Sequence, residues 1–249
     1  MVGGSDSGLD IVCPCRTGNK NNELRYAMRS WEANVPHRDL YLWGAPPAWT
    51  QNVIKRPMQQ GSNFRLNTTK MMLAACQDPD ISNPFIWMND DYFVMKPIPE
   101  VPRLNRGPID RVIAAHPNPG HQYPQGMVAT KNLLIDEGFS EEGILSYELH
   151  MPMLIYKTTM IHALQVYFDS RRPILHKRTL YGNIVDYGGL AVPDNKVVER
   201  HSKWDSDCTF ISTSDMSFEK YPIGAWIKER FPLPSTYEFV ERDPSTIYF

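Results

Sequence analysis

The chain has 249 residues, of which 42% are hydrophobic and 22% are charged, with a formal net charge of −2. These values are ordinary for a globular protein and allow a substantial core. They exclude the overall basic field that typifies nucleic-acid-binding proteins, although a local basic groove remains compatible with them. No apolar run approaches the roughly 18 residues of a membrane span.

The N-terminal residues and the cysteines set expectations about organisation and compartment. Residues 1–8 lack the basic and apolar regions of a signal peptide, so we expect a flexible leader followed by one domain over residues 9–249. The cysteines form neither a CxxC pair nor a dense framework: Cys13, Cys15, Cys76 and Cys208. We therefore expect buried free thiols in a reducing, cytoplasmic setting, and neither a zinc site nor a disulfide scaffold.

The first half of the chain alternates predicted strands and helices. Residues 9–15 and 39–44 read as strands, and residues 23–34 read as a helix with apolar residues at helical spacing and Asn21 or Asn22 as its cap. A second helix is predicted over residues 67–75, with Asn67 or Thr68 as its cap. It precedes an apolar strand over residues 85–88. This order predicts an α/β fold with a mostly parallel sheet flanked by helices.

The second half is less regular. Residues 97–124 are rich in Pro, Gly and Asn, and we expect residues 97–150 to form an irregular acceptor-side insertion or a lid. Helices are predicted over residues 159–170 and 219–230, and a short strand begins at residue 209.

The most informative motif is the pair Asp90-Asp91, which directly follows the predicted buried strand over residues 85–88. Adjacent carboxylates repel each other and are costly to desolvate, and a divalent cation at a strand end relieves that cost. Mg²⁺ or Mn²⁺ bound by one or two carboxylates while it also contacts phosphate oxygens suits this place. An exposed Asp-Asp turn between two strands is the alternative.

The loop after the first strand lies at the same predicted sheet edge, because the carboxyl ends of parallel strands meet there. It offers polar and cationic groups that could reach a phosphate: Arg16, Asn19, Lys20 and, further on, Arg25. Among them, we expect Lys20 to be solvated.

Three further segments offer candidate groups. His150 is either a general base for an acceptor hydroxyl or a hydrogen-bonded structural histidine. Residues 171–178 include Arg171, Arg172 and Arg178, which suit phosphate oxygens or form a solvated basic turn. Asp215 either binds a metal or caps the following helix. His201 is a weaker candidate base or metal ligand.

Several common site motifs are missing from the sequence. We find no Gly-x-x-x-x-Gly-Lys-Ser/Thr loop, no Gly-x-Gly-x-x-Gly after the first strand and no Gly-x-Ser-x-Gly elbow. The sequence therefore disfavours a P-loop nucleotidase, a dinucleotide oxidoreductase and a serine hydrolase.

Taken together, these segments resemble the Stealth family of sugar-phosphate transferases. The resemblance rests on Asn22-Glu23-Leu24-Arg25-Tyr26, on Asn67, on Trp87-Met88-Asn89-Asp90-Asp91, on His150-Met151-Pro152, on Lys177-Arg178 and on Ser214-Asp215, which occur in the family's order. It implies a GT-A-like glycosyltransferase fold, a nucleotide-sugar donor and a Mg²⁺ or Mn²⁺ ion.

The resemblance also implies roles for individual residues. Asp91 and Asp90 would hold the metal, and the catalytic residues would be Asp90, His150 and Asp215. The residues expected to bind the donor are Arg16, Asn19, Arg25, Asn67, Asn89 and Arg178.

One departure from the family leaves the reaction open. The acidic turn that the family carries after its first strand is replaced here by Cys15-Arg16-Thr17-Gly18. Transfer of a sugar and transfer of a sugar phosphate to an acceptor hydroxyl therefore both remain possible. The acceptor is a saccharide or another hydroxyl compound. A glycosyltransferase acting on a hydroxylated base in DNA and a non-catalytic carbohydrate- or nucleotide-binding module are the alternatives, and the oligomeric state is not predicted.

Overall fold

The computed structural model describes residues 8–18, 20–170 and 175–239. Its central sheet has the strand order β3-β2-β1-β4-β7. These strands are β1 (Ile11–Cys15), β2 (Leu40–Gly44), β3 (Ile54–Pro57), β4 (Phe85–Trp87) and β7 (Met153–Ile155). All neighbouring pairs are parallel except β4 and β7. The predicted α/β class with a mostly parallel sheet is confirmed.

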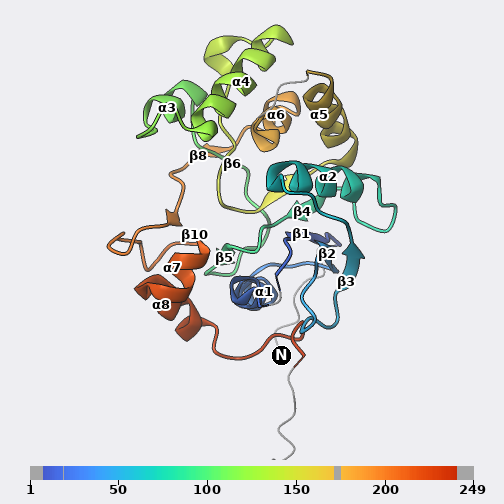
Figure 1. The fold of residues 1–249 in the computed structure, drawn as a ribbon, viewed down its shortest axis with the longest axis vertical. Helices are drawn as coiled ribbons and strands as arrows, with labels where there is room; N and C mark the ends of the chain where they lie inside the picture. Colours follow the sequence, from blue (N-terminus) through green and yellow to red (C-terminus); the bar gives the residue numbers. More distant parts are fainter. Residues whose placement is uncertain (1–7, 19, 171–174, 240–249) are drawn as a thin grey trace, which may run out of the picture.

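Helices cover both faces of this sheet (Figure 1). One face is covered by α1 (Asn22–Asn34) and, beyond a small sheet, by α7 (Asp215–Lys220) and α8 (Pro222–Arg230). The small sheet contains β5 (Tyr92–Val94), β9 (Lys196–Val197) and β10 (Phe210–Thr213). The other face is covered by α2 (Phe64–Gln77), with α5 (Lys157–Asp169) packed on it.

Further elements extend the α2 side of the molecule (Figure 1). These are β6 (Leu104–Asn105), α3 (Ile109–Ala114), α4 (Gln122–Asp136), the short 3₁₀ helix η1 (Glu141–Gly143), α6 (Lys177–Ile184) and β8 (Leu190–Ala191). Because α6 packs against α5 and α4, this half of the molecule is one helical layer.

Alternating side chains of the central strands enter two separate cores. In β1, Ile11, Cys13 and Cys15 pack on the α1 side, whereas Val12 packs on the α2 side. In β4, Ile86 faces the α1 side and Trp87 faces the α2 side. Burial on both faces explains why these strands read as continuous apolar runs rather than alternating ones. The four cysteines are free and buried, as expected.

The predicted first helix is confirmed and is fixed at both ends. The side chain of Asn21 accepts a hydrogen bond from the Leu24 N–H and caps α1. The indole Nε1 of Trp31 donates to the Tyr92 carbonyl at 2.7 Å, which ties α1 to the strand that follows the carboxylate pair.

Two helix boundaries differ from the prediction. Helix α2 begins at Phe64, because the Asn63 side chain accepts from the N–H groups of Arg65 and Leu66, so Asn67 lies inside the helix and does not cap it. The late helix is two helices, because Pro222 lacks an N–H and begins α8 after α7 has ended.

The segments predicted to be irregular contain more structure than expected. Residues 97–150 include α3 and α4, and Arg178 lies in the first turn of the helix α6. His150 lies shortly before the strand β7. Asn19, Arg171, Arg172 and most of the predicted leader lie outside the described residues. None of the helices in the described part of the chain is long and apolar enough to cross a membrane.

Candidate functional site

The site lies where the order of the central sheet reverses. Strand β1 is flanked by β2 on one side and by β4 on the other. The strands that follow β1 are therefore added first on one side of it and then, from β4 on, on the other side. In open α/β sheets, ligands bind in the crevice outside the carboxyl ends of two such strands. Arg16 follows β1 and Asn89 follows β4 by one residue, and both line a cavity of about 460 Å³, which we call the main pocket.

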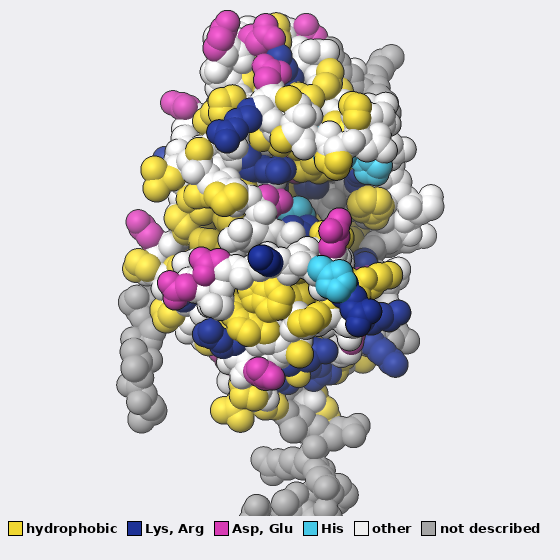
Figure 2. All heavy atoms as spheres, turned by 90° about the vertical axis from the view of Figure 1, so that its left-hand side faces the viewer, with side chains coloured by type: hydrophobic (Ala, Val, Ile, Leu, Met, Phe, Trp, Pro, Cys, Tyr) yellow, Lys and Arg dark blue, Asp and Glu magenta, His cyan; other side chains and the backbone are white. Residues whose placement is uncertain are grey.

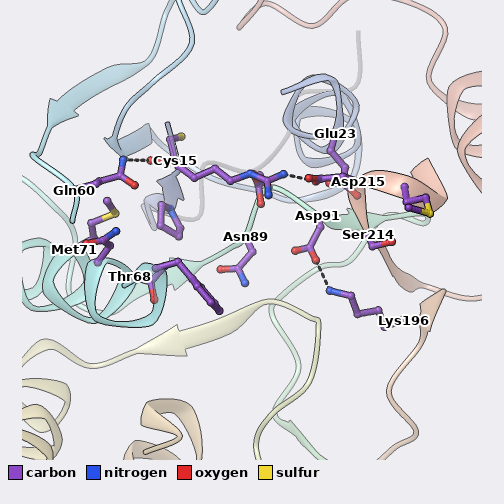
Figure 3. A pocket seen from close by; sticks show the side chains of 16 residues that line it. Cys15, Glu23, Gln60, Thr68, Met71, Asn89, Asp91, Lys196, Ser214 and Asp215 are labelled. Carbon is purple, nitrogen blue, oxygen red and sulfur yellow. Dashed lines mark hydrogen bonds and ion pairs between the residues drawn. The ribbon is translucent and has the colours of Figure 1, made fainter. Parts of the chain in front are cut away.

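Six of the sequence-predicted site residues line the main pocket together. They come from four segments of the chain: Arg16, Asn67, Asn89, Asp90, Asp91 and Asp215. Figure 3 shows that Glu23 and Asp215 lie side by side at one end, whereas Thr68 and Met71 of α2 lie at the other. The topology therefore assembles a polar site from residues that are up to about 200 positions apart.

Asp90 and Asp91 are mostly buried, with side chains 19% and 14% exposed. Asn21 Nδ2 donates to Asp90 Oδ2 at 2.8 Å, and Lys196 Nζ lies 2.8 Å from Asp91 Oδ2. Burial, followed by the charge of Asp91, raises the pKa of Asp90 to about 6. The pair therefore carries negative charge that its protein neighbours only partly offset.

Glu23 is a third buried carboxyl in the main pocket that the sequence interpretation missed. It lies in the first turn of α1, is 4% exposed and accepts a hydrogen bond from the Thr213 hydroxyl. Burial raises its pKa to about 9 despite that hydrogen bond, and the neighbouring carboxylates Asp91 and Asp90 add to the shift. Its position directly after the polar turn, within the Asn-Glu-Leu-Arg block, was the available signal.

Arg16 lines the main pocket and pairs with Asp215. The guanidinium donates to Asp215 Oδ1, and its Nε lies 3.9 Å from Asp90 Oδ2. Ser214, with a reciprocal bond to Ser217, caps α7, so Asp215 is the first residue of that helix rather than its cap. The side chains of Arg16 and Asp215 are 56% and 60% exposed, so water screens this pair and either group can exchange its partner for a ligand.

The loop before α2, α2 itself and α7 contribute further groups to the main pocket, of which the sequence singled out Asn67 but not Gln60, Phe64 or Met216. Gln60 Nε2 donates to the Cys15 carbonyl at 2.8 Å, and Asn67 closes the loop before α2 through two hydrogen bonds with the Gly61 backbone. Phe64 and Met216 line the main pocket from opposite sides and are 68% and 55% exposed. Large apolar side chains at a polar opening can contact a flat or apolar part of a ligand.

A second cavity of about 180 Å³, the side pocket, adjoins the main pocket, because Thr68 and Asn89 line both. Two predicted site residues lie here: His150 and Arg178. His150 Nδ1 lies 2.8 Å from Asp194 Oδ2, and the His150 N–H donates to Asp194 Oδ1 at 2.9 Å. Asp194, which follows a Pro in an otherwise unremarkable loop, was not predicted.

Arg178 is 7% exposed and is held by internal acceptors. Its NH1 donates to the Tyr92 hydroxyl at 2.8 Å and to the Leu149 carbonyl, and its NH2 donates to the Met151 carbonyl at 3.0 Å. These bonds fix the backbone on both sides of His150. Arg178 therefore positions this segment, in addition to contributing positive charge to the side pocket.

Three predicted residues lie outside the two pockets or outside the described chain. The Arg25 guanidinium donates to Glu238 and lies over the Trp49 ring in a separate surface hollow, so the structure does not bring it to the main pocket. His201 is exposed and lines neither pocket. Asn19 is not among the described residues.

The donor set of the main pocket is compatible with a divalent cation. Within the described residues, no group of three or more His, Cys, Asp and Glu side chains forms a complete metal-binding cluster. Asp90 and Asp91 are two adjacent oxygen donors whose repulsion a dication would relieve, as the raised pKa of Asp90 indicates. Mg²⁺ is commonly bound in this way, by one or two carboxylates together with substrate phosphates and water.

One face of the molecule is hollowed between the α3–α4 region and the α7–α8 region (Figure 2). Lys, Arg and His side chains are visible within this hollow, whereas charges of both signs are scattered over the rest of that face.

Comparisons with known proteins identify the fold. No family model and no curated protein sequence matches the chain. Among solved structures, an active-site mutant of LgtC superposes with a TM-score of 0.51 at 11% identity, over 90% of this chain and 94% of that chain. The galactosyltransferase LgtC in complex with donor and acceptor sugar analogues gives a TM-score of 0.50 at 12% identity, over the same shares. The chain therefore has the GT-A fold that the sequence predicted, and membership of the Stealth family stays a prediction.

Proposed function

We propose that the protein is a metal-dependent transferase that moves a sugar or a sugar phosphate from a nucleotide-sugar donor to an acceptor hydroxyl. The observation that carries this proposal is the carboxylate pair Asp90-Asp91 at the reversal point of the sheet, one cavity away from the His150–Asp194 pair. The GT-A fold supports it, since the structurally similar proteins include a galactosyltransferase in complex with donor and acceptor sugar analogues.

The main pocket would hold the donor's diphosphate. Asp91 and Asp90 would bind Mg²⁺ or Mn²⁺, which supplies positive charge to the phosphate oxygens when bound. Arg16 would exchange Asp215 for a phosphate oxygen, because a guanidinium pairs well with either. Asn67 and Asn89 offer amide groups to the rest of the donor, and the exposed ring of Phe64 offers a surface for its base.

His150 would accept the proton of the acceptor hydroxyl. Asp194 accepts from Nδ1 and so holds the ring in the tautomer whose Nε2 is a free acceptor. A base oriented by a carboxylate in this way contributes on the order of 10²–10⁴-fold to a transfer reaction. In this proposal Asp215 releases Arg16 to the donor rather than acting as a base.

The two possible reactions break different bonds. In glycosyl transfer, the hydroxyl oxygen attacks the anomeric carbon, the bond to the diphosphate breaks, and a nucleoside diphosphate leaves. In sugar-phosphate transfer, the oxygen attacks the β-phosphorus, the phosphoanhydride bond breaks, and a nucleoside monophosphate leaves. The order of the Stealth-like motifs favours the second reaction, and the missing acidic turn after β1 favours the first.

The test is incubation with a panel of nucleotide sugars and Mn²⁺, with identification of the nucleotide product. A monophosphate identifies sugar-phosphate transfer, and a diphosphate identifies glycosyl transfer. Asp91→Asn is the matched variant and should abolish turnover, whereas Asp110→Asn, at an exposed carboxylate outside both pockets, should retain it. Donor binding without cleavage of any panel member would instead identify a binding module and overturn the proposal.

A further inference from the structure

The side pocket carries an excess of positive charge. Three cationic side chains line it: Arg65, Lys177 and Arg178. Within the described chain, none of them is within ion-pair distance of a carboxylate. Grouped cations without a counter-ion repel each other, so the cavity favours an anionic occupant.

Lys177 lies at the boundary between the two pockets. Its Nζ donates to Thr68 Oγ1 at 3.1 Å, and Thr68 lines both cavities. Burial, together with the charges of Arg178 and Arg65, lowers the pKa of Lys177 to about 8, although Glu148 acts in the opposite direction. An anion beside Lys177 would relieve this repulsion.

Glu148 also lines the side pocket, but it offsets the cations only in part, because it is one carboxylate against three cationic side chains. Its Oε2 lies 3.3 Å from His176 Nδ1, and its Oε1 accepts from the backbone N–H and the hydroxyl of Thr179, both at 3.2 Å. The carboxylate is therefore occupied by its own partners. The guanidinium Nε of Arg178 is buried and has no hydrogen-bond partner within the described residues, which leaves a further donor unsatisfied.

We propose that the side pocket binds a phosphate group that the acceptor carries close to its reacting hydroxyl. This rests on the proposed function, since it takes His150 as the base. His150 lines the same cavity, so a hydroxyl that reaches its imidazole brings the neighbouring part of the acceptor into the cavity that Arg65 and Lys177 also line. A cavity of about 180 Å³ accommodates a phosphate ester and a small part of the molecule that bears it. The acceptor class is therefore a hydroxyl compound with an adjacent phosphate.

The first test measures binding of inorganic phosphate by calorimetry, without turnover. Lys177→Gln and Arg65→Gln should each weaken binding about tenfold, as expected for loss of one charge-assisted contact. Lys177→Arg should retain it. Lys70→Gln, at an exposed lysine on the same helix as Arg65, is the control and should have no effect. Equal affinity in wild type and Lys177→Gln would overturn the proposal.

A second measurement separates the side pocket from the donor site. Phosphate binding is repeated with the main pocket saturated by a nucleoside diphosphate and Mn²⁺. We expect phosphate still to bind when the nucleotide is present, because the side pocket and the main pocket are separate cavities that have only Thr68 and Asn89 in common. Displacement of phosphate by the nucleotide, or its loss in Asp91→Asn but not in Lys177→Gln, would place the phosphate in the main pocket and overturn the proposal.

The third measurement compares acceptors in the presence of a productive donor. Sugar phosphates and hydroxylated nucleoside monophosphates are compared with their dephosphorylated forms, and oligonucleotides containing the same base form a separate arm. The proposal is supported if turnover requires the acceptor's phosphate and Lys177→Gln raises the acceptor KM. Turnover of the sugar phosphates or nucleoside monophosphates would identify a phosphate monoester as the ligand, whereas turnover of the oligonucleotides would identify a phosphate diester. Equal use of dephosphorylated acceptors overturns it. If no donor is cleaved but phosphate binding still depends on Lys177, the proposed function fails and the anion site stands.

Discussion

His150 and Asp194 are joined by two hydrogen bonds, from Nδ1 to Oδ2 at 2.8 Å and from the His150 N–H to Oδ1 at 2.9 Å. Together they fix both the backbone and the ring of His150. Burial would raise the pKa of Asp194, but the hydrogen bonds and charge of His150 outweigh it and hold that pKa below its usual range. The carboxylate is therefore ionised at neutral pH and able to orient the imidazole.

Asp194→Asn tests this orientation. An amide can donate to Nδ1 and so favour the wrong tautomer, which removes the free acceptor at Nε2. We expect kcat to fall by about 10–100-fold with the donor KM unchanged, and His150→Gln to lose about 10²–10⁴-fold. Steady-state kinetics with a productive donor is the measurement.

The matched control for this pair is Asp186→Asn, at an exposed carboxylate whose left-handed backbone suits asparagine (φ 48). It should leave kcat unchanged. Full activity in Asp194→Asn would show that His150 is a structural histidine.

Asp90→Asn should stabilise the metal-free protein. The raised pKa of Asp90 means that ionisation costs folding free energy, and this cost appears as the pH rises above the unfolded value near 4 and is complete above about pH 6. The asparagine can still accept from Asn21. We expect a gain of about 2 kcal/mol at neutral pH that disappears toward pH 4, measured by urea unfolding. A loss of stability at neutral pH would contradict the predicted repulsion.

Divalent cations should stabilise the wild-type protein, because they relieve the repulsion between Asp90 and Asp91. Mn²⁺ relieves the repulsion in the wild type, so it should raise the melting temperature of the wild type in a concentration-dependent manner. Asp90→Asn and Asp91→Asn each remove one carboxylate and should show little shift. An equal Mn²⁺ shift in all three proteins would place the cation elsewhere.

Arg16→Gln should weaken binding of the donor while it leaves the stability of the fold nearly unchanged. Because Arg16 and Asp215 are both more than half exposed, their pair contributes only about 0–1 kcal/mol to folding. Loss of a charged contact to the donor should nevertheless raise the donor KM about tenfold. Lys96→Gln, which breaks another exposed pair, with Asp207, is the control and should leave the KM unchanged. An unchanged donor KM in Arg16→Gln would remove Arg16 from the donor site.

Gly182→Ala should disturb the helix that carries Lys177 and Arg178. A Cβ at this position would lie 2.4 Å from the ring of Tyr147, in a buried part of α6. Overpacking of this kind costs about 1–3 kcal/mol, which exceeds the helix propensity gained. Gly143→Ala, where a Cβ would meet no atom within 4 Å, serves as the control in urea unfolding. Equal stability of the two variants would show that Tyr147 moves aside at little cost.

The sequence determined the sheet and one edge of the site. Strands β1 and β4 are buried on both faces, so they appear as continuous apolar runs, and the polar residues that follow such runs must lie at the sheet edge. That local pattern was sufficient to identify Arg16, Asn89, Asp90 and Asp91 as neighbours. It was not sufficient for α2 or α8, whose starts depend on the Asn63 cap and on Pro222.

Only the tertiary structure decided which charged residues belong together. Glu23, Asp194 and Lys196 lie in segments without a distinctive local pattern, and long-range packing brings them to the pockets. The same packing pairs Arg25 with Glu238 outside the main pocket, although Arg25 lies in the Asn-Glu-Leu-Arg-Tyr block on which the family resemblance rests. The sequence determines the charge of a side chain, but contacts between helices and strands determine which group it pairs with. Those contacts decide whether the charge binds a ligand or stabilises the fold.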